Sequence, residues 1–131
     1  MTTAKGQFEL ASWNEDTYEE LGSGGKLTRA SVTQQFSGDV TGAGAVEWLM
    51  CYQADGTARF VGWQRVDGSV GGAEGSFVLA TDGEFDGGKA VGRWTVVPGS
   101  GSGDLAGLTG EGRFEAPHGP TATFTLDYDL G

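Results

Sequence analysis

The side chains best suited to chemistry gather around one short turn. Residues 54–57 read Ala-Asp-Gly-Thr, and an Asp-Gly pair tolerates the positive φ angles of a two-residue hairpin turn. Pairing the flanking strands around this turn puts five apolar side chains on one face: Trp48, Met50, Tyr52, Val61 and Trp63. Trp94 extends the patch from a neighbouring strand. The patch predicts the wall of a ligand pocket, with plain core packing or a dimer contact as alternatives.

Arg65 shares that face in the same register, opposite Val46 and away from the turn. A guanidinium that points inward needs an anionic partner, and its planar fork matches a carboxylate. The sequence therefore predicts a small hydrophobic ligand that carries a carboxylate near Arg65. The alternative is an arginine exposed to solvent at the rim of the barrel.

Glu47 is the candidate for proton transfer, because it stands between apolar neighbours opposite Gln64. Burial would raise the pKa of Glu47 and make it a proton donor or base. No serine lies on a recognisable nucleophile elbow, and no second carboxylate has a suitable geometry. The catalytic residues, if there are any, are therefore unknown apart from this one candidate.

The sequence gives no reason to expect a metal or a cofactor. A lone Cys51 cannot form an internal disulfide, and with only His118 beside it a zinc cluster is not supported. Residues 96–112 are rich in glycine but lack the Gly-Lys-Ser/Thr end that a phosphate loop needs before a helix. We interpret this segment as a connection between strands, with the turn at 99–104.

The net charge of the chain limits the kinds of partner that are expected. The net charge of −10 repels phosphate backbones and anionic lipid surfaces, so neither nucleic acid nor a membrane is an expected partner. The first residues lack the apolar stretch of a signal peptide, and no window approaches a membrane span. These features predict a cytoplasmic protein, organised as one domain over residues 1–131.

The elements that position these residues are strands. The chain has 25 glycines, but 7 Phe, 4 Trp and 3 Tyr alternate with turn residues around them, which is typical of a folded β protein and not of a disordered chain. Residues 14–25 break the alternation and are interpreted as a loop. Eight strands are expected near 4–13, 26–37, 42–54, 57–67, 74–82, 89–98, 108–117 and 121–130.

Eight sequential strands with both faces partly apolar predict an antiparallel barrel of the meander type, because closure removes the sheet edges. The last hairpin supports this arrangement, since a three-residue loop at 118–120 aligns Phe114 with Phe124 and Gly112 with Leu126. A barrel of this size is filled by side chains or holds one small ligand.

Several segments carry a resemblance to a known family: LTRASVTQQFSGDVTGAG, VEWLMCY, ADGTARFVG, GSFVL, VVPGSGSGDLAGLTGEGRFEAPHG and FTLDY. Together they resemble the bacterial family of unknown function DUF3224 over nearly the whole chain. That family is similar in fold to allene oxide cyclase and to plant dirigent proteins, which are calycin-like eight-stranded barrels. The resemblance implies the barrel and assigns no catalytic residue.

Three functions fit these observations. The first is a barrel that binds a small hydrophobic molecule, and it is the one preferred. The second is a cofactor-free isomerase or cyclase that folds such a molecule in the same cavity. The third is a filled barrel that acts as a structural or interaction protein, for instance as a homodimer. A cavity would separate the third function from the other two.

Overall fold

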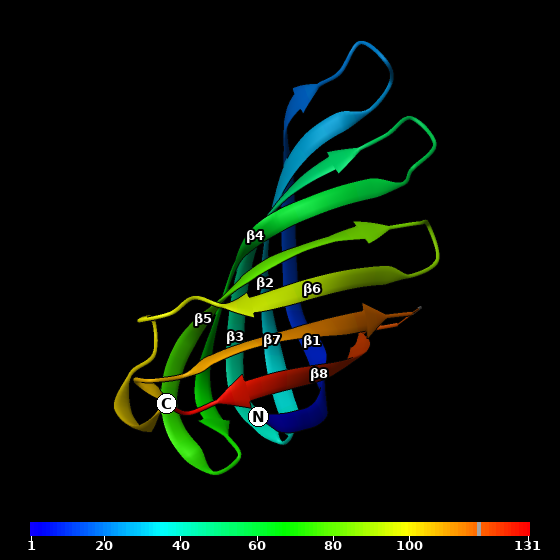
Figure 1. Ribbon diagram of the computed structural model, residues 1–131. Helices are drawn as coiled ribbons and strands as arrows, with labels where there is room; N and C mark the ends of the chain where they lie inside the picture. Colours follow the sequence, from blue (N-terminus) through cyan, green and yellow to red (C-terminus); the bar gives the residue numbers. More distant parts are fainter. Residues whose placement is uncertain (118) are drawn as a thin grey trace.

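The computed structural model describes residues 1–117 and 119–131. His118, considered above together with Cys51, lies outside the described residues. Eight antiparallel strands follow one another in chain order around a closed barrel (Figure 1). Their bounds are β1 Thr2–Glu20, β2 Lys26–Gly38, β3 Val40–Tyr52, β4 Ala58–Val70, β5 Ala73–Phe85, β6 Ala90–Val96, β7 Thr109–Ala116 and β8 Thr121–Asp129. The predicted eight-stranded antiparallel meander barrel is confirmed.

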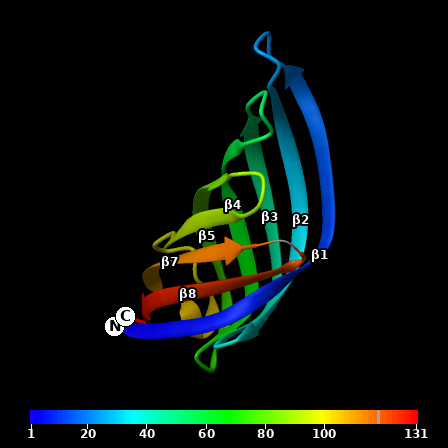
Figure 2. The same ribbon diagram turned by 90° about the vertical axis from the view of Figure 1, so that its right-hand side faces the viewer.

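The two ends of the barrel differ. The turns of the four hairpins β1–β2, β3–β4, β5–β6 and β7–β8 lie together at one end, which we call the mouth. β1 runs on to Glu20, beyond Glu9, the last residue that pairs with β8, so the β1–β2 side of the barrel rises well above the β7–β8 side at the mouth (Figure 2). The chain termini lie at the opposite end.

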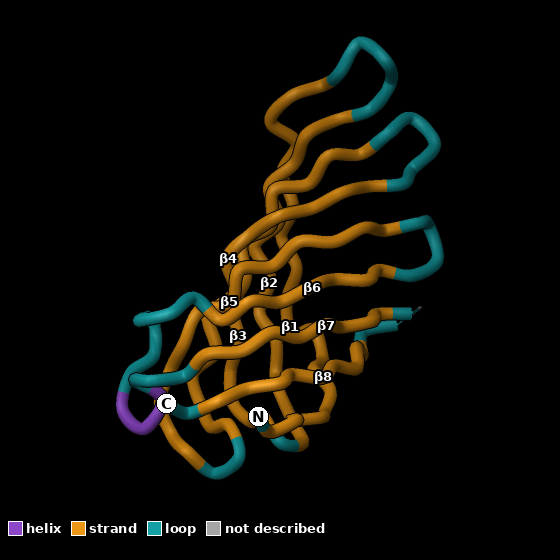
Figure 3. Tube along the Cα trace, in the orientation of Figure 1, coloured by secondary structure: helices purple, strands orange, loops and turns teal. Residues whose placement is uncertain are grey.

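The glycine-rich segment closes that opposite end, where it connects β6 to β7 as predicted. It contains the short 3-10 turn η1, Gly103–Leu105 (Figure 3), whose Leu105 is fully buried. Two serine hydroxyls hold the segment against β5: Ser100 Oγ accepts from the Val78 amide at 3.0 Å and Ser102 Oγ from the Ser76 amide at 3.0 Å. The segment therefore satisfies the edge of β5 beyond the end of β6. Across the described ranges, no helix is long and apolar enough to span a membrane.

The first strand is longer than predicted, because residues 14–20 belong to β1 and not to a loop. β1 pairs with β8 only over residues 2–9, and beyond that point it is an edge strand on one side. Edge strands carry charged residues instead of a clean apolar alternation, which explains why the sequence pattern did not reveal it. Two register shifts, at Leu10/Ser12 and Thr17/Glu19, interrupt the alternation further.

The register of the β3–β4 hairpin was predicted wrongly by one residue. Tyr52 pairs with Ala58 and Trp48 with Gly62, not with Arg59 and Trp63. The connection is a longer turn, in which the Gly56 amide donates to the Gln53 carbonyl at 3.0 Å and Gly56 takes a positive φ of 89°. A shift of one residue reverses every side chain on β4. In the last hairpin, by contrast, the predicted alignment of Phe114 with Phe124 and Gly112 with Leu126 is confirmed.

Aromatic rings fill much of the interior, and most of them lie opposite a glycine on the neighbouring strand. Among the residues that the structure describes, seven such pairs occur: Phe36–Gly42, Trp48–Gly62, Phe60–Gly83, Phe114–Gly92, Trp94–Gly112, Tyr128–Gly110 and Phe124–Gly6. The rings pack on one another at centroid distances such as 5.4 Å for Trp94–Phe124 and 5.6 Å for Trp94–Phe114, within the favourable range for aromatic pairs. At Gly6, Gly62, Gly83 and Gly92 a Cβ atom would come within 3 Å of the ring of the paired residue, so these glycines leave the space that a ring occupies.

Gly92 offers the clearest test of this arrangement, because a Cβ atom there would overlap the Phe114 ring. We expect Gly92→Ala to lower the free energy of unfolding by roughly 2 kcal/mol or more, since forced overpacking of a core typically costs 1–3 kcal/mol. Gly22→Ala is the control: a Cβ at Gly22 meets no atom within 4 Å, and we expect a change under about 0.5 kcal/mol. Urea denaturation measures both. Equal stability of Gly92→Ala and the wild type would contradict the packing described here.

Candidate functional site

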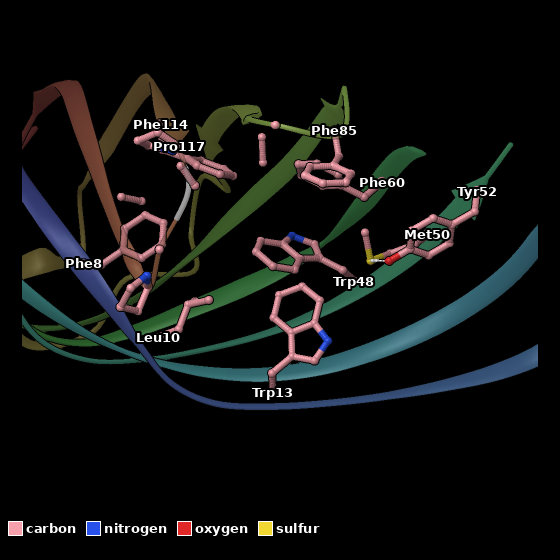
Figure 4. A pocket seen from close by; sticks show the side chains of 16 residues that line it. Phe8, Leu10, Trp13, Trp48, Met50, Tyr52, Phe60, Phe85, Phe114 and Pro117 are labelled. Atoms are coloured by element: carbon pink, nitrogen blue, oxygen red, sulfur yellow. Dashed lines mark hydrogen bonds between the residues drawn. The ribbon is translucent and has the colours of Figure 1, made fainter. Parts of the chain in front are cut away.

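The interior is hollow near the mouth. An apolar cavity of about 290 Å³ lies there (Figure 4). We call it the mouth cavity; its lining is Phe8, Leu10, Trp13, Trp48, Met50, Tyr52, Phe60, Phe85, Gly88, Ala90, Phe114, Ala116, Pro117, Gly119, Pro120 and Ala122. Within the described residues, no charged side chain belongs to this lining.

The mouth cavity exists because its two walls differ in side-chain size. The wall from β3 and β4 is aromatic, with the Trp48 and Phe60 ring centroids 5.2 Å apart. The facing wall from β6, β7 and β8 offers only small side chains at this level: Ala90, Ala116 and Ala122. Below the cavity, Phe8 and Phe114 pack edge to face at 5.6 Å and close its floor. Phe114 of β7 meets the Trp48 and Phe60 rings at centroid distances of 6.4 and 6.3 Å, and beside it the alanines leave the space of the cavity open.

Trp13 completes the cavity and was not predicted as a site residue. The first register shift leaves Ala11 as the extra residue between Leu10 and Ser12, so that Leu10 and Trp13 both face inward. The ring centroids of Trp13 and Trp48 are 5.7 Å apart, and Figure 4 shows the two rings next to each other in the cavity. The only trace of this in the sequence is a spacing of three between the two apolar residues, which breaks the alternation of a strand.

A carboxylate adjoins the mouth cavity. Glu15 Oε1 accepts from Trp13 Nε1 at 3.0 Å, and Glu15 Oε2 accepts from Thr28 Oγ1 at 2.6 Å. Partial burial acts to raise the pKa of Glu15, but the polar hydrogens of Thr28, Tyr52 and Trp13, together with the charge of Lys26, lower it overall. Glu15 is therefore held in its ionised form.

Tyr52 links this carboxylate to the mouth cavity. Its hydroxyl donates to Met50 Sδ at 3.7 Å (Figure 4), and Lys26 Nζ lies 5.3 Å from the ring centroid. Burial, and then the neighbouring Glu15 carboxylate, raise the pKa of Tyr52, so the phenol stays protonated. Tyr52 also lines a second, polar depression, with Glu15, Thr17, Gly24, Gly25, Lys26, Thr28, Gln53, Ala54 and Gly56. The mouth cavity and the polar depression therefore meet at this residue.

The structure brings together some of the predicted ligand-binding residues and separates others. Trp48, Met50 and Tyr52 face inward and line the mouth cavity. Trp94 also faces inward but lies deeper, packed against Phe124. Val61 and Trp63 point outward because of the register shift, with 54% and 63% of their surfaces exposed. Their predicted place beside Trp48 is therefore wrong.

Arg65 and Glu47 also point outward, contrary to prediction. Arg65 Nη1 lies 3.6 Å from Asp67 Oδ2, and both side chains are exposed. Glu47 pairs with Arg29 at 2.6 Å. Hydrogen bonds from Ser31 and Arg29 lower the pKa of Glu47, whereas burial had been expected to raise it. Arg65 therefore does not face a ligand inside the barrel, and Glu47 is not buried as the predicted proton transfer requires.

The expected opposition of Glu47 and Gln64 is likewise absent, because the two side chains point to opposite faces of the sheet. Gln64 is fully buried in the core, where its Nε2 donates to Gln34 Oε1 at 2.6 Å. Cys51 is exposed. Among the residues that the structure describes, no three His, Cys, Asp or Glu side chains come close enough to hold a metal ion.

Comparison with known proteins places the chain in a family. Residues 4–128 match the model of the family described as "Protein of unknown function (DUF3224)". The chain belongs to the DUF3224 family. A crystal structure of a DUF3224 protein of unknown function from Shewanella oneidensis MR-1 is similar, with a TM-score of 0.84 and 27% sequence identity, over 100% of this chain and 98% of that one. No curated protein matches the chain.

The DUF3224 resemblance stated above is thus confirmed, and the fold that it implied agrees with the structure. The further likeness to allene oxide cyclase and dirigent proteins stays a prediction. Because the similar crystal structure is itself of a protein of unknown function, the functional argument depends on the mouth cavity and its neighbours.

The hydrogen bond from Thr28 to Glu15 gives a measurable prediction. Thr28→Val keeps the shape of the side chain but removes a bond to the charged carboxylate, so the pKa of Glu15 should rise. Carboxyl ¹³C titration by NMR measures it. Thr81→Val is the control, because Thr81 Oγ1 is buried without a partner among the described residues and lies on β5. If the pKa of Glu15 is the same in Thr28→Val and the wild type, this hydrogen bond does not hold the carboxylate.

Proposed function

We propose that this protein binds a small, largely apolar molecule in the mouth cavity. The observation that carries the proposal is the apolar, largely aromatic lining of a cavity that opens at the mouth, with no charged side chain among its described residues. Ligand sites are typically apolar concavities of this kind with a few polar groups at one side. Here the polar groups are those of Tyr52 and its neighbour Glu15.

The size of the mouth cavity limits the ligand. An apolar cavity of about 150 Å³ stays dry and binds benzene, and this cavity has about 290 Å³. It therefore suits a molecule with one or two rings, or one ring with a short alkyl chain. Such a ligand gains roughly 0.8 kcal/mol for each methylene group that it removes from water.

A cofactor-free isomerase or cyclase is the second candidate function, as the predicted likeness to allene oxide cyclase implies. Such an enzyme would use the same apolar cavity to confine its substrate. A proton-transfer mechanism is less well supported, because a general acid or base works best with a pKa near the working pH. The pKa of Tyr52 is raised further above neutral pH, and the pKa of Glu15 is lowered further below it, so neither group exchanges a proton readily near pH 7. Ligand binding is therefore preferred over catalysis as the function of the mouth cavity.

The third function considered, a filled barrel that serves only as a structural or homodimeric protein, is not proposed. It required an interior packed from end to end, and the mouth end has a cavity. An exposed apolar patch does exist on the outer face, formed by Leu49, Val61 and Trp63. It lies on β3 and β4 and has no part in the ligand site proposed here.

Filling the mouth cavity tests the proposal. Ala90→Leu puts a larger side chain into the lining, so it should weaken binding of butylbenzene about tenfold or more, because overlap costs typically 1–3 kcal/mol. Ala43→Leu makes the same change at an exposed position of β3 and serves as the matched control. Trp13 and Trp48 line the cavity and report binding by fluorescence.

Two results would speak against the mouth cavity as the binding site. One is wild-type protein that shows no response to butylbenzene up to its solubility limit. The other is equal affinity in Ala90→Leu and the wild type, which would place the binding elsewhere on the molecule.

A further inference from the structure

We propose that the polar group of the ligand is a hydrogen-bond donor, an amine or a hydroxyl, and that it binds Glu15 in the polar depression. This inference rests on the proposed function and names the chemical class of the ligand: an apolar ring with a donor at the end of a short chain. It replaces the carboxylate that the sequence predicted near Arg65, because Arg65 lies on the outer face.

The first step is the position of Glu15 beside the mouth cavity. Trp13 lines the cavity and donates directly to Glu15 Oε1. Tyr52 belongs to both the mouth cavity and the polar depression, and Glu15 belongs to the depression. A chain that leaves the apolar cavity past Tyr52 therefore comes next to the Glu15 carboxylate.

The second step is the geometry of the carboxylate. Trp13 and Thr28 each use one acceptor position, on different oxygens of Glu15, and the Tyr52 hydroxyl lies against the same carboxylate, so its orientation is fixed. An ionised carboxylate has about four acceptor positions and no donor. The positions left over can take only a donor from a ligand. Because the orientation is fixed before the ligand arrives, little conformational entropy is lost on binding.

The third step concerns the cations that could bind a carboxylate group if the ligand were an acid and not a hydrogen-bond donor. Lys26 is the cation that lines the polar depression within the described residues, and its side chain is exposed. An exposed, flexible ammonium is well hydrated and gains little from a single ion pair. Arg59 and Arg113, which neighbour the cavity residues Phe60 and Phe114 in sequence, have exposed side chains. Arg29 and Arg65 pair with carboxylates outside the barrel, Glu47 and Asp67. A carboxylate in the depression would also face the charge of Glu15.

The aromatic rings of Trp13 and Tyr52 also favour a hydrogen-bond donor on the ligand. Aromatic faces attract ammonium groups, and the Tyr52 ring already has Lys26 Nζ at 5.3 Å from its centroid. An amine that reaches Glu15 past Tyr52 would lie beside this ring and the Glu15 carboxylate, and it would share the depression with the Lys26 ammonium. A hydroxyl would make the same hydrogen bond without the charge.

The experiment uses three probes with one phenyl ring on a four-carbon chain: butylbenzene, 4-phenylbutylamine and 5-phenylpentanoate. Calorimetric titration at neutral pH compares the wild type with Glu15→Gln and Lys26→Met. We expect the amine to bind about tenfold more tightly than butylbenzene, as a partly exposed charge-assisted hydrogen bond allows, and the acid to bind most weakly. Glu15→Gln should remove the advantage of the amine and leave butylbenzene unchanged, while Lys26→Met should not weaken the amine.

The proposal is overturned if the acid binds as tightly as the amine, or if the preference for the amine survives in Glu15→Gln. An acid that binds best and loses its advantage in Lys26→Met would make Lys26 the anchor. Binding of butylbenzene tests the cavity by itself, so its failure contradicts the proposed function instead. Should Glu15→Gln not fold, the Glu15 carboxyl ¹³C signal of the wild type decides: we expect the amine to shift it by more than butylbenzene does, and an equal response would contradict the contact.

Discussion

The pairing of aromatic rings with glycines is the constraint on which this barrel depends. The interior of an eight-stranded barrel is just wide enough for side chains to fill, so a ring fits where the neighbouring strand contributes no side chain. Phe114 over Gly92 and Phe60 over Gly83 show this most directly, because a Cβ at either glycine would collide with the ring. The pairing also fixes the register: a slip of one residue would set a ring against a side chain and turn the apolar face toward water.

The mouth cavity forms where the pairing of rings with glycines ends. Toward the mouth, Phe8 pairs with Ala122 and Phe85 with Ala90, so a methyl group replaces the glycine, and above the Phe8–Phe114 contact the small side chains leave the interior open. β1 and β2 continue beyond the ends of β7 and β8 at the mouth, as Figure 2 shows. An aromatic wall therefore faces alanines. Glu15 marks the point where the apolar lining gives way to polar groups.

Much of this fold was open to prediction from the sequence, and the errors have physical causes. The strands and their closure follow from alternation and turn residues, and the β7–β8 register from Phe114 and Phe124. The β3–β4 register failed because the Asp-Gly pair also suits a longer turn with Gly56 at positive φ. The ring-glycine rule would have corrected it, since it pairs Trp48 with Gly62. Glu15 and Trp13 were missed because one extra residue in β1 changes which side chains face inward, and alternation alone does not show such a residue.

Diffraction from crystals under xenon pressure tests the central claim most directly, because xenon enters dry apolar cavities and needs no knowledge of the natural ligand. The account predicts strong anomalous density inside the mouth cavity, between Phe8, Trp48 and Phe114, and its loss in Ala90→Leu. Xenon bound only outside the barrel, or a mouth cavity closed by the surrounding side chains, would contradict the claim that this end of the barrel is built to hold an apolar molecule.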